Sequence, residues 1–509
     1  MKQKLIGCAV LVLALLGGVR QGFARPGDLD TSFGSGGLIT QSISIAPYYW
    51  LVSAALQADG KYLVAGESGN TNLSHHILQR YNPDGSLDSD FGVSGSINIL
   101  NVSNSVTLQP DGKILIQASR DNLCLVERFN SDGSIDPGFG IDGLAQVSCP
   151  STNLNQAYPI MTLQRDGKIL LHATRNSNSC SNAMGTHGTL LELARLNANG
   201  SLDTTFGAEG YTNTCLSVAS ALDLPKTITE LTDGKLLVAG GHYCEPYLIR
   251  YNPDGSLDRT FASSSSTPGV WIERRVDLGR SSSGAGRLAK GVGISPEGKV
   301  TIAYSMGTTD GNNLTIFPTP ESNDQYVNLY RYNPDGSPDN TFGESGLLRI
   351  QTPYADIRFF SLQNNQKMLL VGRHFLEQSG NRLSDFTVMR LNVDGSFDSD
   401  FGTTGKVTTD FGGNLDFANG SIISSDNCKL TVVGSSFDVV PSSLEMSRYL
   451  LGCEDHQVVR PPPIYQQLPQ PIPHFEPRPI TPIINSRPAI QPVQQKNVWY
   501  NSLFNFFKK

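Results

Sequence analysis

The sequence predicts an all-β fold, a seven-bladed β-propeller of four-stranded antiparallel blades, followed by a disordered Pro-rich C-terminal tail. First, one pattern of three blocks recurs seven times between residues 27 and 453 of the 509-residue chain. Second, each block holds short apolar or alternating runs bounded by Gly, Asp and Asn, which is typical of strands and turns. Third, 51 Gly, 29 Pro and only 17% charged residues exclude a coiled coil, a helical bundle and a mostly disordered chain.

The repeated unit is clearest from Gly85, where "GSLDSDFGVSGSINIL", "SVTLQPDGKILIQAS" and "CLVERFN" follow one another. The seven units begin 48 to 81 residues apart, at Gly27, Gly85, Gly133, Gly200, Gly255, Gly336 and Gly395. Repetition with this period indicates stacked supersecondary units that share a continuous core.

Each unit contains four predicted strands, a to d. Strand a follows "FGxxG", as at Lys406 to Phe411, strand b precedes "LQ", strand c is the "KILIQ" run, and strand d ends in "RYN". The b to c link, "PDGK", has the Asp-Gly chemistry of a tight hairpin with positive φ. The longer d to a link suits a crossover between neighbouring sheets, so each unit is predicted to form one blade. No strand exchange between the first and last blades is then needed.

The chain divides into four predicted regions. Residues 1–24 are predicted to be a signal peptide, because Lys2 and Lys4 precede an apolar run and small residues end at Ala24. Residues 25–453 form the seven-unit propeller, 454–493 a Pro-rich extended linker, and 494–509 a short amphipathic aromatic segment. The linker region holds 11 prolines between 461 and 492 and cannot build a core.

The terminal segment offers a candidate docking site. On a helical wheel its apolar face is made of Trp499, Leu503, Phe506 and Phe507. A partner groove, a peripheral membrane contact or the side of the propeller could order it. The alternative is an aromatic end without a role.

Charge excludes one class of partner. Residues 25–453 carry a net charge of −13, which would repel a phosphate backbone, so we expect no nucleic-acid partner.

The "RYNPDGSLD", "FGxSG" and "LQPDGK" blocks resemble the delta-60 repeat family of bacterial exported proteins, over about 84% of the chain. The departures are local: Ala262 replaces the Gly after Phe261, and "SPEGK" and "NNQK" replace two hairpins. The resemblance implies a propeller, export to a secreted, periplasmic or cell-surface location, and binding.

Three residue types occupy one position in every unit, and we interpret them as structural. They are Arg80, Arg128, Arg195, Arg250, Arg331, Arg390 and Arg448; Asp30, Asp88, Asp136, Asp203, Asp258, Asp339 and Asp398; and Phe33, Phe91, Phe139, Phe206, Phe261, Phe342 and Phe401. Identical sites around a ring suit blade packing, with Phe between blades and Arg pairing with Asp. A repeated ligand site is the alternative, and so is a calcium loop at Asn82, Asp84, Ser86 and Asp88, although Val93 stands where such a loop needs Glu.

No catalytic residue, metal site or cofactor is predicted, because no motif such as HExxH, a P-loop or G-x-S-x-G occurs. The variable c to d loops are the candidate binding rim, around His187, His242, Asn312 and Phe317. We expect an exported, non-enzymatic binding or scaffold propeller for an unknown protein or glycan at the cell envelope. The alternative is a propeller hydrolase or lyase with carboxylates in the central channel, which requires an asymmetric cluster of acidic and basic side chains that the sequence does not reveal.

Seven cysteines lie beyond Cys8 in this exported chain, so disulfides are expected. Strand positions favour three pairs: Cys149 with Cys180, Cys215 with Cys244, and Cys428 with Cys453. Cys124 is left as a buried free thiol. Coincidence or metal binding is the alternative to this set.

Overall fold

A computed structural model provides the structure of the chain. It describes residues 24–42, 48–70, 73–99, 105–120, 123–148, 160–181, 187–216, 224–242, 245–272, 287–306, 326–352, 354–378, 381–412, 415–437 and 443–453. These residues belong to a compact unit, residues 1–454, and residues 455–509 are a separate unit. The predicted signal peptide up to residue 23, the linker 454–493 and the segment 494–509 lie outside the described residues. Within the described part of the chain no helix has the length and hydropathy to span a membrane.

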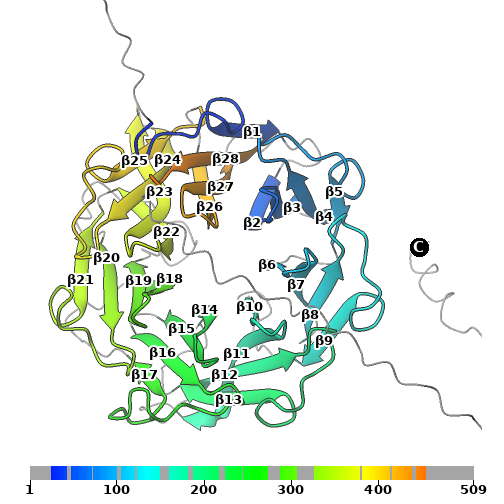
Figure 1. Cartoon of the computed structure of the whole chain (residues 1–509), viewed down its shortest axis with the longest axis vertical. Coiled ribbons are helices and arrows are strands. Elements are labelled where there is room, and N and C mark those ends of the chain that lie inside the picture. Colours follow the sequence, from blue (N-terminus) through cyan, green and yellow to red (C-terminus); the bar gives the residue numbers. More distant parts are fainter. Residues whose placement is uncertain are drawn as a thin grey trace, which may run out of the picture. The chain divides into compact units, whose positions relative to one another are not determined.

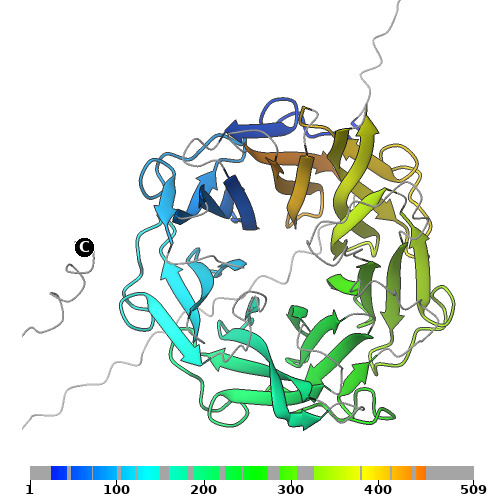
Figure 2. The same ribbon diagram turned by 180° about the vertical axis from the view of Figure 1, so that it is seen from behind.

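Five sheets are separate, four-stranded and antiparallel, and they stand around the centre of a ring (Figures 1 and 2). From inner to outer strand they are β2 (Tyr48–Leu56), β3 (Tyr62–Asn70), β4 (Leu73–Tyr81) and β5 (Ser96–Asn98); β6 (Ser105–Leu108), β7 (Ile114–Arg120), β8 (Leu123–Phe129) and β9 (Leu144–Ser148); β10 (Ile160–Leu163), β11 (Ile169–Ser181), β12 (His187–Leu196) and β13 (Tyr211–Leu216); β14 (Leu224–Glu230), β15 (Leu236–His242), β16 (Glu245–Tyr251) and β17 (Val270–Ile272); and β18 (Arg287–Ile294), β19 (Val300–Met306), β20 (Tyr326–Tyr332) and β21 (Leu347–Gln351).

The remaining eight strands form a single sheet. Its members are β22 (Ala355–Leu362), β23 (Met368–Gln378), β24 (Asn381–Leu391), β25 (Lys406–Thr409), β26 (Leu415–Ile423), β27 (Lys429–Phe437), β28 (Ser443–Leu450) and β1 (Leu38–Ser42). One parallel bridge, between Ser384 of β24 and Leu415 of β26, joins its two antiparallel halves. The prediction of seven separate four-stranded blades is therefore wrong: the described strands make five such blades and one eight-stranded sheet, because β26 pairs with β24 where β25 has ended.

The sheets are also out of phase with the repeats. The strand that follows "FGxxG" is the outer strand of the preceding sheet. For example, β5 pairs with β4 and completes the sheet of β2, β3 and β4, whereas the sequence pattern predicts that it begins a new blade. In the same way β1, near the start of the chain, pairs with β28 in the last repeat, with Leu38 opposite Ser447 and Ser42 opposite Ser443. The expectation that no strand is exchanged is wrong, since β1 completes the last sheet.

The b to c hairpins have the predicted turn chemistry. In five of them a Gly takes a φ of 80° to 85°: Gly60, Gly112, Gly167, Gly234 and Gly298. In the other two, Gln366 and Asn427 take the same conformation with φ of 62° and 58°. A side chain in this left-handed region costs about 1 kcal/mol relative to Gly.

The hydrophobic core is divided into layers between neighbouring sheets. One layer joins Leu115 and Val126 to Leu171 of the next sheet. Another joins Val64 of β3 to Met446 of β28, and so closes the ring between the first and last sheets. In a propeller of this kind each sheet is stabilised by burial against both neighbours.

The recurring Arg, Asp and Phe have the predicted structural role. In every repeat Arg Nε lies 2.6 to 2.9 Å from Asp Oδ2, and the guanidinium covers the Phe ring with its carbon 4.1 to 4.7 Å from the ring centre. The arginine also donates to a backbone carbonyl of the next repeat, as from Arg128 to Ala198 at 2.7 Å. At Asp88, the hydrogen bond from Lys61 and the nearby Arg80 outweigh burial and hold the carboxyl pKa below its usual value. These residues therefore link neighbouring sheets.

The turn oxygens that resemble a calcium loop bond one another instead. Asn82 Nδ2 donates to Ser86 Oγ at 3.0 Å, and Ser86 donates from its backbone N–H and its hydroxyl to Asp84 Oδ1. This is the side-chain cap of a turn.

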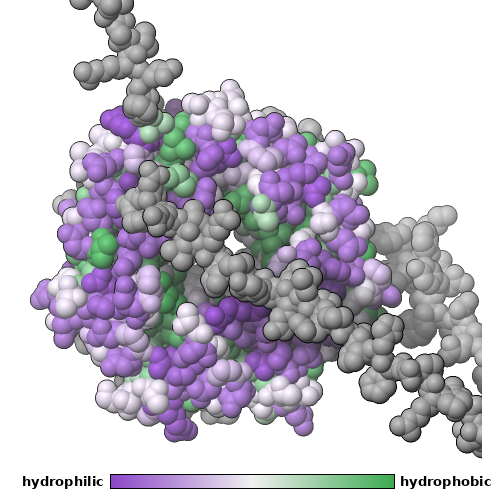
Figure 3. Space-filling model, viewed as in Figure 1, coloured by the Kyte–Doolittle hydropathy of each residue, from purple (hydrophilic) through white to green (hydrophobic). Residues whose placement is uncertain are grey.

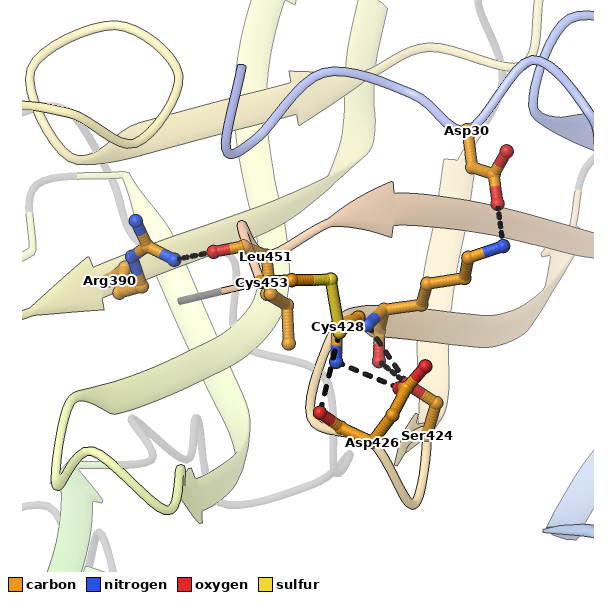
Figure 4. Close-up of a disulfide and its surroundings, with 8 residues drawn as sticks. Asp30, Arg390, Ser424, Asp426, Cys428, Leu451 and Cys453 are labelled. Carbon is orange, nitrogen blue, oxygen red and sulfur yellow. Dashed lines mark hydrogen bonds and ion pairs between the residues drawn. A yellow bond between two sulfur atoms is a disulfide. The ribbon is translucent and has the colours of Figure 1, made fainter. Parts of the chain in front are cut away.

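The disulfides differ in part from the predicted set. Cys180 is joined to Cys215, so the pairs Cys149 with Cys180 and Cys215 with Cys244 are wrong: the end of β11 lies beside the outer strand β13 of its own sheet. Cys124 is disulfide-bonded rather than free. Cys428 and Cys453 are joined as expected, between the β26–β27 turn and the segment after β28 (Figure 4).

Candidate functional site

A cluster of carboxylates lies where the two halves of the eight-stranded sheet meet. It comprises Asp385 of β24, Asp410 just after β25 and Asp416 of β26, with carboxylate oxygens all within 4.8 Å of one another. β25 ends at Thr409, and the bridge from Ser384 to Leu415 then brings β26 beside β24. Residues from three strands are thus gathered at one point of the ring.

Hydrogen bonds from neighbouring backbone N–H groups reach the Asp410 and Asp416 carboxylates. The Gly412 N–H donates to Asp410 Oδ1 at 2.8 Å, and the Phe411 N–H donates to Asp416 Oδ2 at 3.1 Å. Ser384 Oγ donates to the Asp416 carbonyl at 3.0 Å. The positions of the carboxylates are therefore determined by the backbone.

A fourth carboxyl, Glu445 of β28, lies beside Asp416, and both are buried, with exposed fractions of 1% and 0%. Burial, with the negative charges of Asp385 and Asp410, raises the pKa of Asp416 to about 7. Burial and the charge of Asp416 raise the pKa of Glu445 to about 8. Because two adjacent buried carboxylates repel each other, the pair retains a proton near neutral pH.

Asp385 connects this buried pair to the outside. It is 8% exposed, and burial and the charge of Asp410 raise its pKa to about 6 although Lys406 opposes the shift. Asp410 itself is exposed. The cluster therefore runs from a solvent-facing carboxylate to a proton-bearing buried pair.

Lys406 and His374 adjoin Asp385. His374 lies opposite Asp385 in the β23–β24 pairing, and Lys406 Nζ is 3.2 Å from His374 Nδ1. Burial and the positive charge of Lys406 lower the His374 pKa to about 4, so the imidazole is neutral at physiological pH. The ring of Tyr354, a residue 43% exposed, stands edge-on to that imidazole at 6.2 Å.

A second charged group surrounds Asp356 on the inner strand β22. Arg358 Nε and Arg373 Nε lie 3.1 and 3.2 Å from Asp356 Oδ2. Burial opposes ionisation, but the charges of Arg358, Lys290 and Arg373 hold the Asp356 pKa below its usual value.

Acid–base chemistry and cation binding are the two uses that the carboxylates allow. Asp385, Asp410 and Asp416 would supply three of the six to eight oxygen ligands that Ca²⁺ takes, which is too few to define a cation site. A carboxyl that carries a proton near pH 7 beside an exposed carboxylate is the usual pairing of an acid and a base.

The predicted binding residues do not join this cluster. His187 begins β12 and His242 ends β15, each in another sheet. Asn312, Phe317, Trp499, Leu503, Phe506 and Phe507 lie outside the described residues, so their predicted roles stay predictions. The sequence signal that was missed is the segment "DFGGNLD" at Asp410 to Asp416, which occurs in one repeat.

Propeller enzymes are among the solved structures that resemble the chain. A polysaccharide lyase, Uly1, has 10% sequence identity and a TM-score of 0.46, and the match covers 83% of this chain and 92% of that one. An ulvan lyase of family PL25 has 10% identity and a TM-score of 0.40, covering 67% and 79%. The α-L-arabinofuranosidase Arb93A from Fusarium graminearum has 10% identity and a TM-score of 0.35, covering 81% and 96%. At these values the likeness concerns the fold.

The prediction of a non-enzymatic scaffold without catalytic candidates is corrected here. It was founded on the absence of an asymmetric cluster of acidic and basic side chains, and that premise is wrong: Asp385, Asp410, Asp416 and Glu445 form one beside Lys406 and His374. The sequence had left an enzyme open as the alternative, and the similar solved structures named above are themselves enzymes, although their likeness concerns the fold alone.

The sequence comparisons show a similarity to a family model and give no activity. No curated protein matches the chain in sequence. Six segments, 57–91, 109–139, 188–206, 231–261, 321–342 and 367–401, match a family model described as "Domain of unknown function (DUF5122) beta-propeller". The chain is thus similar to a family of propeller repeats.

Proposed function

We propose that the chain is a hydrolase or lyase that cleaves a glycan by acid–base catalysis at the junction of β24, β25 and β26. The observation that supports it is the gathering of three carboxyl groups at this junction, where the pKa values of Asp385 and Asp416 are raised to about 6 and 7 beside the exposed Asp410. A proton donor with a pKa near the working pH gives the largest benefit to general acid catalysis.

The residues have distinct roles in this proposal. Asp385 is the general acid, because it is within reach of solvent and its pKa is about 6. Asp410, exposed beside it, is the base or nucleophile. The Asp416–Glu445 pair holds a proton behind Asp385, while burial and the charge of Asp410 keep the Asp385 carboxyl partly protonated.

The separation of the carboxylates bears on the reaction. Their oxygens lie within 4.8 Å, which is closer to the roughly 5 Å of glycosidases that retain anomeric configuration than to the roughly 6.5–9.5 Å of those that invert it. If the reaction is hydrolysis, we expect retention. If it is elimination, neutral His374 is the candidate base.

The proposed setting is outside the cytoplasm, in the secreted fraction or at the cell envelope. The disulfides Cys180–Cys215 and Cys428–Cys453 suit an oxidising compartment. The resemblance to the exported delta-60 repeat proteins points in the same direction.

The test is an activity screen with the full chain on a panel of neutral and acidic polysaccharides. New reducing ends report hydrolysis, and ultraviolet absorbance of an unsaturated product reports elimination. Asp385→Asn should lower the rate of cleavage at least about 100-fold, as loss of a general acid does, while the exposed control Asp400→Asn should not. Cleavage that Asp385→Asn leaves intact, or no cleavage of any polysaccharide, would overturn the proposal.

A further inference from the structure

Five inner strands carry a β-bulge at the same place. In each, one extra residue interrupts the pairing with the next strand, opposite the fourth and fifth residues after the hairpin Lys. By register, the extra residues are Val52 in β2, Lys226 in β14, Lys290 in β18, Arg358 in β22 and Asn419 in β26. Bulges of this kind often redirect a side chain next to a functional site.

The three cations fall in three consecutive sheets around the ring, those of β14, β18 and β22 (Figure 1). By contrast, the inner strands β2, β6 and β10 contain no charged residue. Residues 25–453 carry a net charge of −13, so a cationic row is not a consequence of overall composition. The cations at the bulge positions therefore lie in three neighbouring inner strands, two of which also carry an acidic residue, Glu230 in β14 and Asp356 in β22.

The described side chains of this row have more positive than negative charge. Arg358 and Arg373 share the single carboxylate of Asp356, and Lys290 is close enough to lower the pKa of that carboxyl. Arg373 is 2% exposed, and its Nη1 has no hydrogen-bond partner among the residues that the structure describes. Arg358 and Lys290 are half-buried, so solvent reaches them.

This row adjoins the carboxylate cluster. The Arg373 guanidinium carbon lies 4.1 Å from the centre of the Phe417 ring, and Phe417 directly follows Asp416. Asp356 and Arg373 are opposite each other in the β22–β23 pairing, one position from His374. Arg373 thus contacts β26, the strand that carries Asp416, and links the row to that strand.

We propose that Lys290 and Arg358, supported by Arg373, bind anionic groups of the substrate, so that the glycan is an acidic polysaccharide. This inference rests on the proposed function and adds the substrate class to it. Sugar carboxylates or sulfates would form charge-assisted hydrogen bonds with the two half-buried cations, and Arg373 would keep the site positive from behind.

The test measures binding separately from turnover, with full-length Asp385→Asn protein and three probes: oligogalacturonate, dextran sulfate and neutral dextran. Calorimetry should show binding of an anionic probe that weakens as salt rises, and no binding of neutral dextran. Lys290→Gln and Arg358→Gln should each weaken that binding about 10-fold, the loss expected for one charge-assisted hydrogen bond. Arg349→Gln on the outer strand β21, an exposed matched control, should leave the affinity unchanged.

The result also identifies the anionic group, since oligogalacturonate offers carboxylates and dextran sulfate offers sulfates. Equal binding of neutral dextran, or equal affinities of the Arg358→Gln and Arg349→Gln variants, would overturn the inference. If cleavage depends on Asp385 but acidic and neutral polysaccharides are cleaved alike, the anionic subsite fails and the proposed function stands. If Lys290 and Arg358 bind the anionic probe but no polysaccharide is cleaved, the anionic subsite stands and the proposed function fails.

Discussion

Arg448 Nε donates a hydrogen bond to Asp30 Oδ2 at 2.9 Å, across 418 positions of the sequence. Lys429 Nζ lies 2.8 Å from the same oxygen (Figure 4), and the Arg448 guanidinium also donates to the Pro83 carbonyl at 2.9 Å. Arg448 thus connects the last repeat to both ends of the first repeat.

Asp30→Asn should lower the free energy of unfolding by about 3 kcal/mol, because it leaves the buried Arg448 without its counter-charge. Urea denaturation measures the change. Asp84→Asn, the same substitution at an exposed turn, should cost less than about 1 kcal/mol. Equal losses for the two variants would show that the Arg448–Asp30 pair contributes no more to the free energy of unfolding than an exposed turn residue does.

Gln366→Gly should raise the free energy of unfolding by about 1 kcal/mol, since Gln366 has a φ of 62° where five equivalent hairpins have Gly. Gln366→Ala is the matched control: it also removes the side-chain amide but keeps Cβ, and should bring no gain. Thermal unfolding distinguishes them. A Gly variant no more stable than the Ala variant would contradict the backbone argument.

The buried carboxyl pair predicts that stability falls as pH rises through 7 and 8. Because the folded pKa values of Asp416 and Glu445 are raised to about 7 and 8, the folded protein binds protons that the unfolded chain releases, and the stabilisation is lost above those values. Between about pH 6.5 and pH 9 the loss should be roughly 3 kcal/mol.

The double variant Asp416→Asn with Glu445→Gln should remove this dependence, and exposed Asp394→Asn should preserve it. Denaturant titrations over the same pH range are the measurement. A wild-type stability that stays flat or increases across that range would disprove the shared proton.

Cys428→Ser should lower the free energy of unfolding by about 3 kcal/mol under oxidising conditions, the value for closure of a loop of 25 residues. The bond holds the end of β28 against the β26–β27 turn, and β28 is the strand that receives β1 (Figure 4). Under reducing conditions the wild type and the variant should unfold alike. A difference that persists after reduction would mean that the thiol itself, rather than the bond, is stabilising.

The architecture of strands and hairpins was accessible from sequence because each rests on local chemistry that recurs. The turn Gly residues and the Arg, Asp and Phe of each repeat can be recognised because they recur at equivalent positions. Which sheet a strand joins was not accessible, because the link before strand a is long enough for either choice. The sequence also could not predict that the last two sets of strands form one eight-stranded sheet, because their joining depends on one bridge between Ser384 and Leu415.

The site was missed for the complementary reason. Asp385 of β24, Asp416 of β26 and Asp410 just after β25 have no spacing that marks a motif. Their pKa values follow from burial that only the assembled ring produces. By contrast, Lys290 and Arg358 occupy equivalent positions, and an alignment of the strands by their hairpins could have singled them out.

Because each sheet takes its outer strand from the following repeat, the unit that duplicates in the gene differs from the unit that folds. A proteolytic cut at a repeat boundary, such as the one before Gly200, would leave the sheet of β10, β11 and β12 without β13 and expose the edge of β12. Unpaired edges of this kind join other chains readily. Fragments of this protein should therefore associate with one another, and gain or loss of a repeat in evolution must have changed the circumference of the ring in a single step.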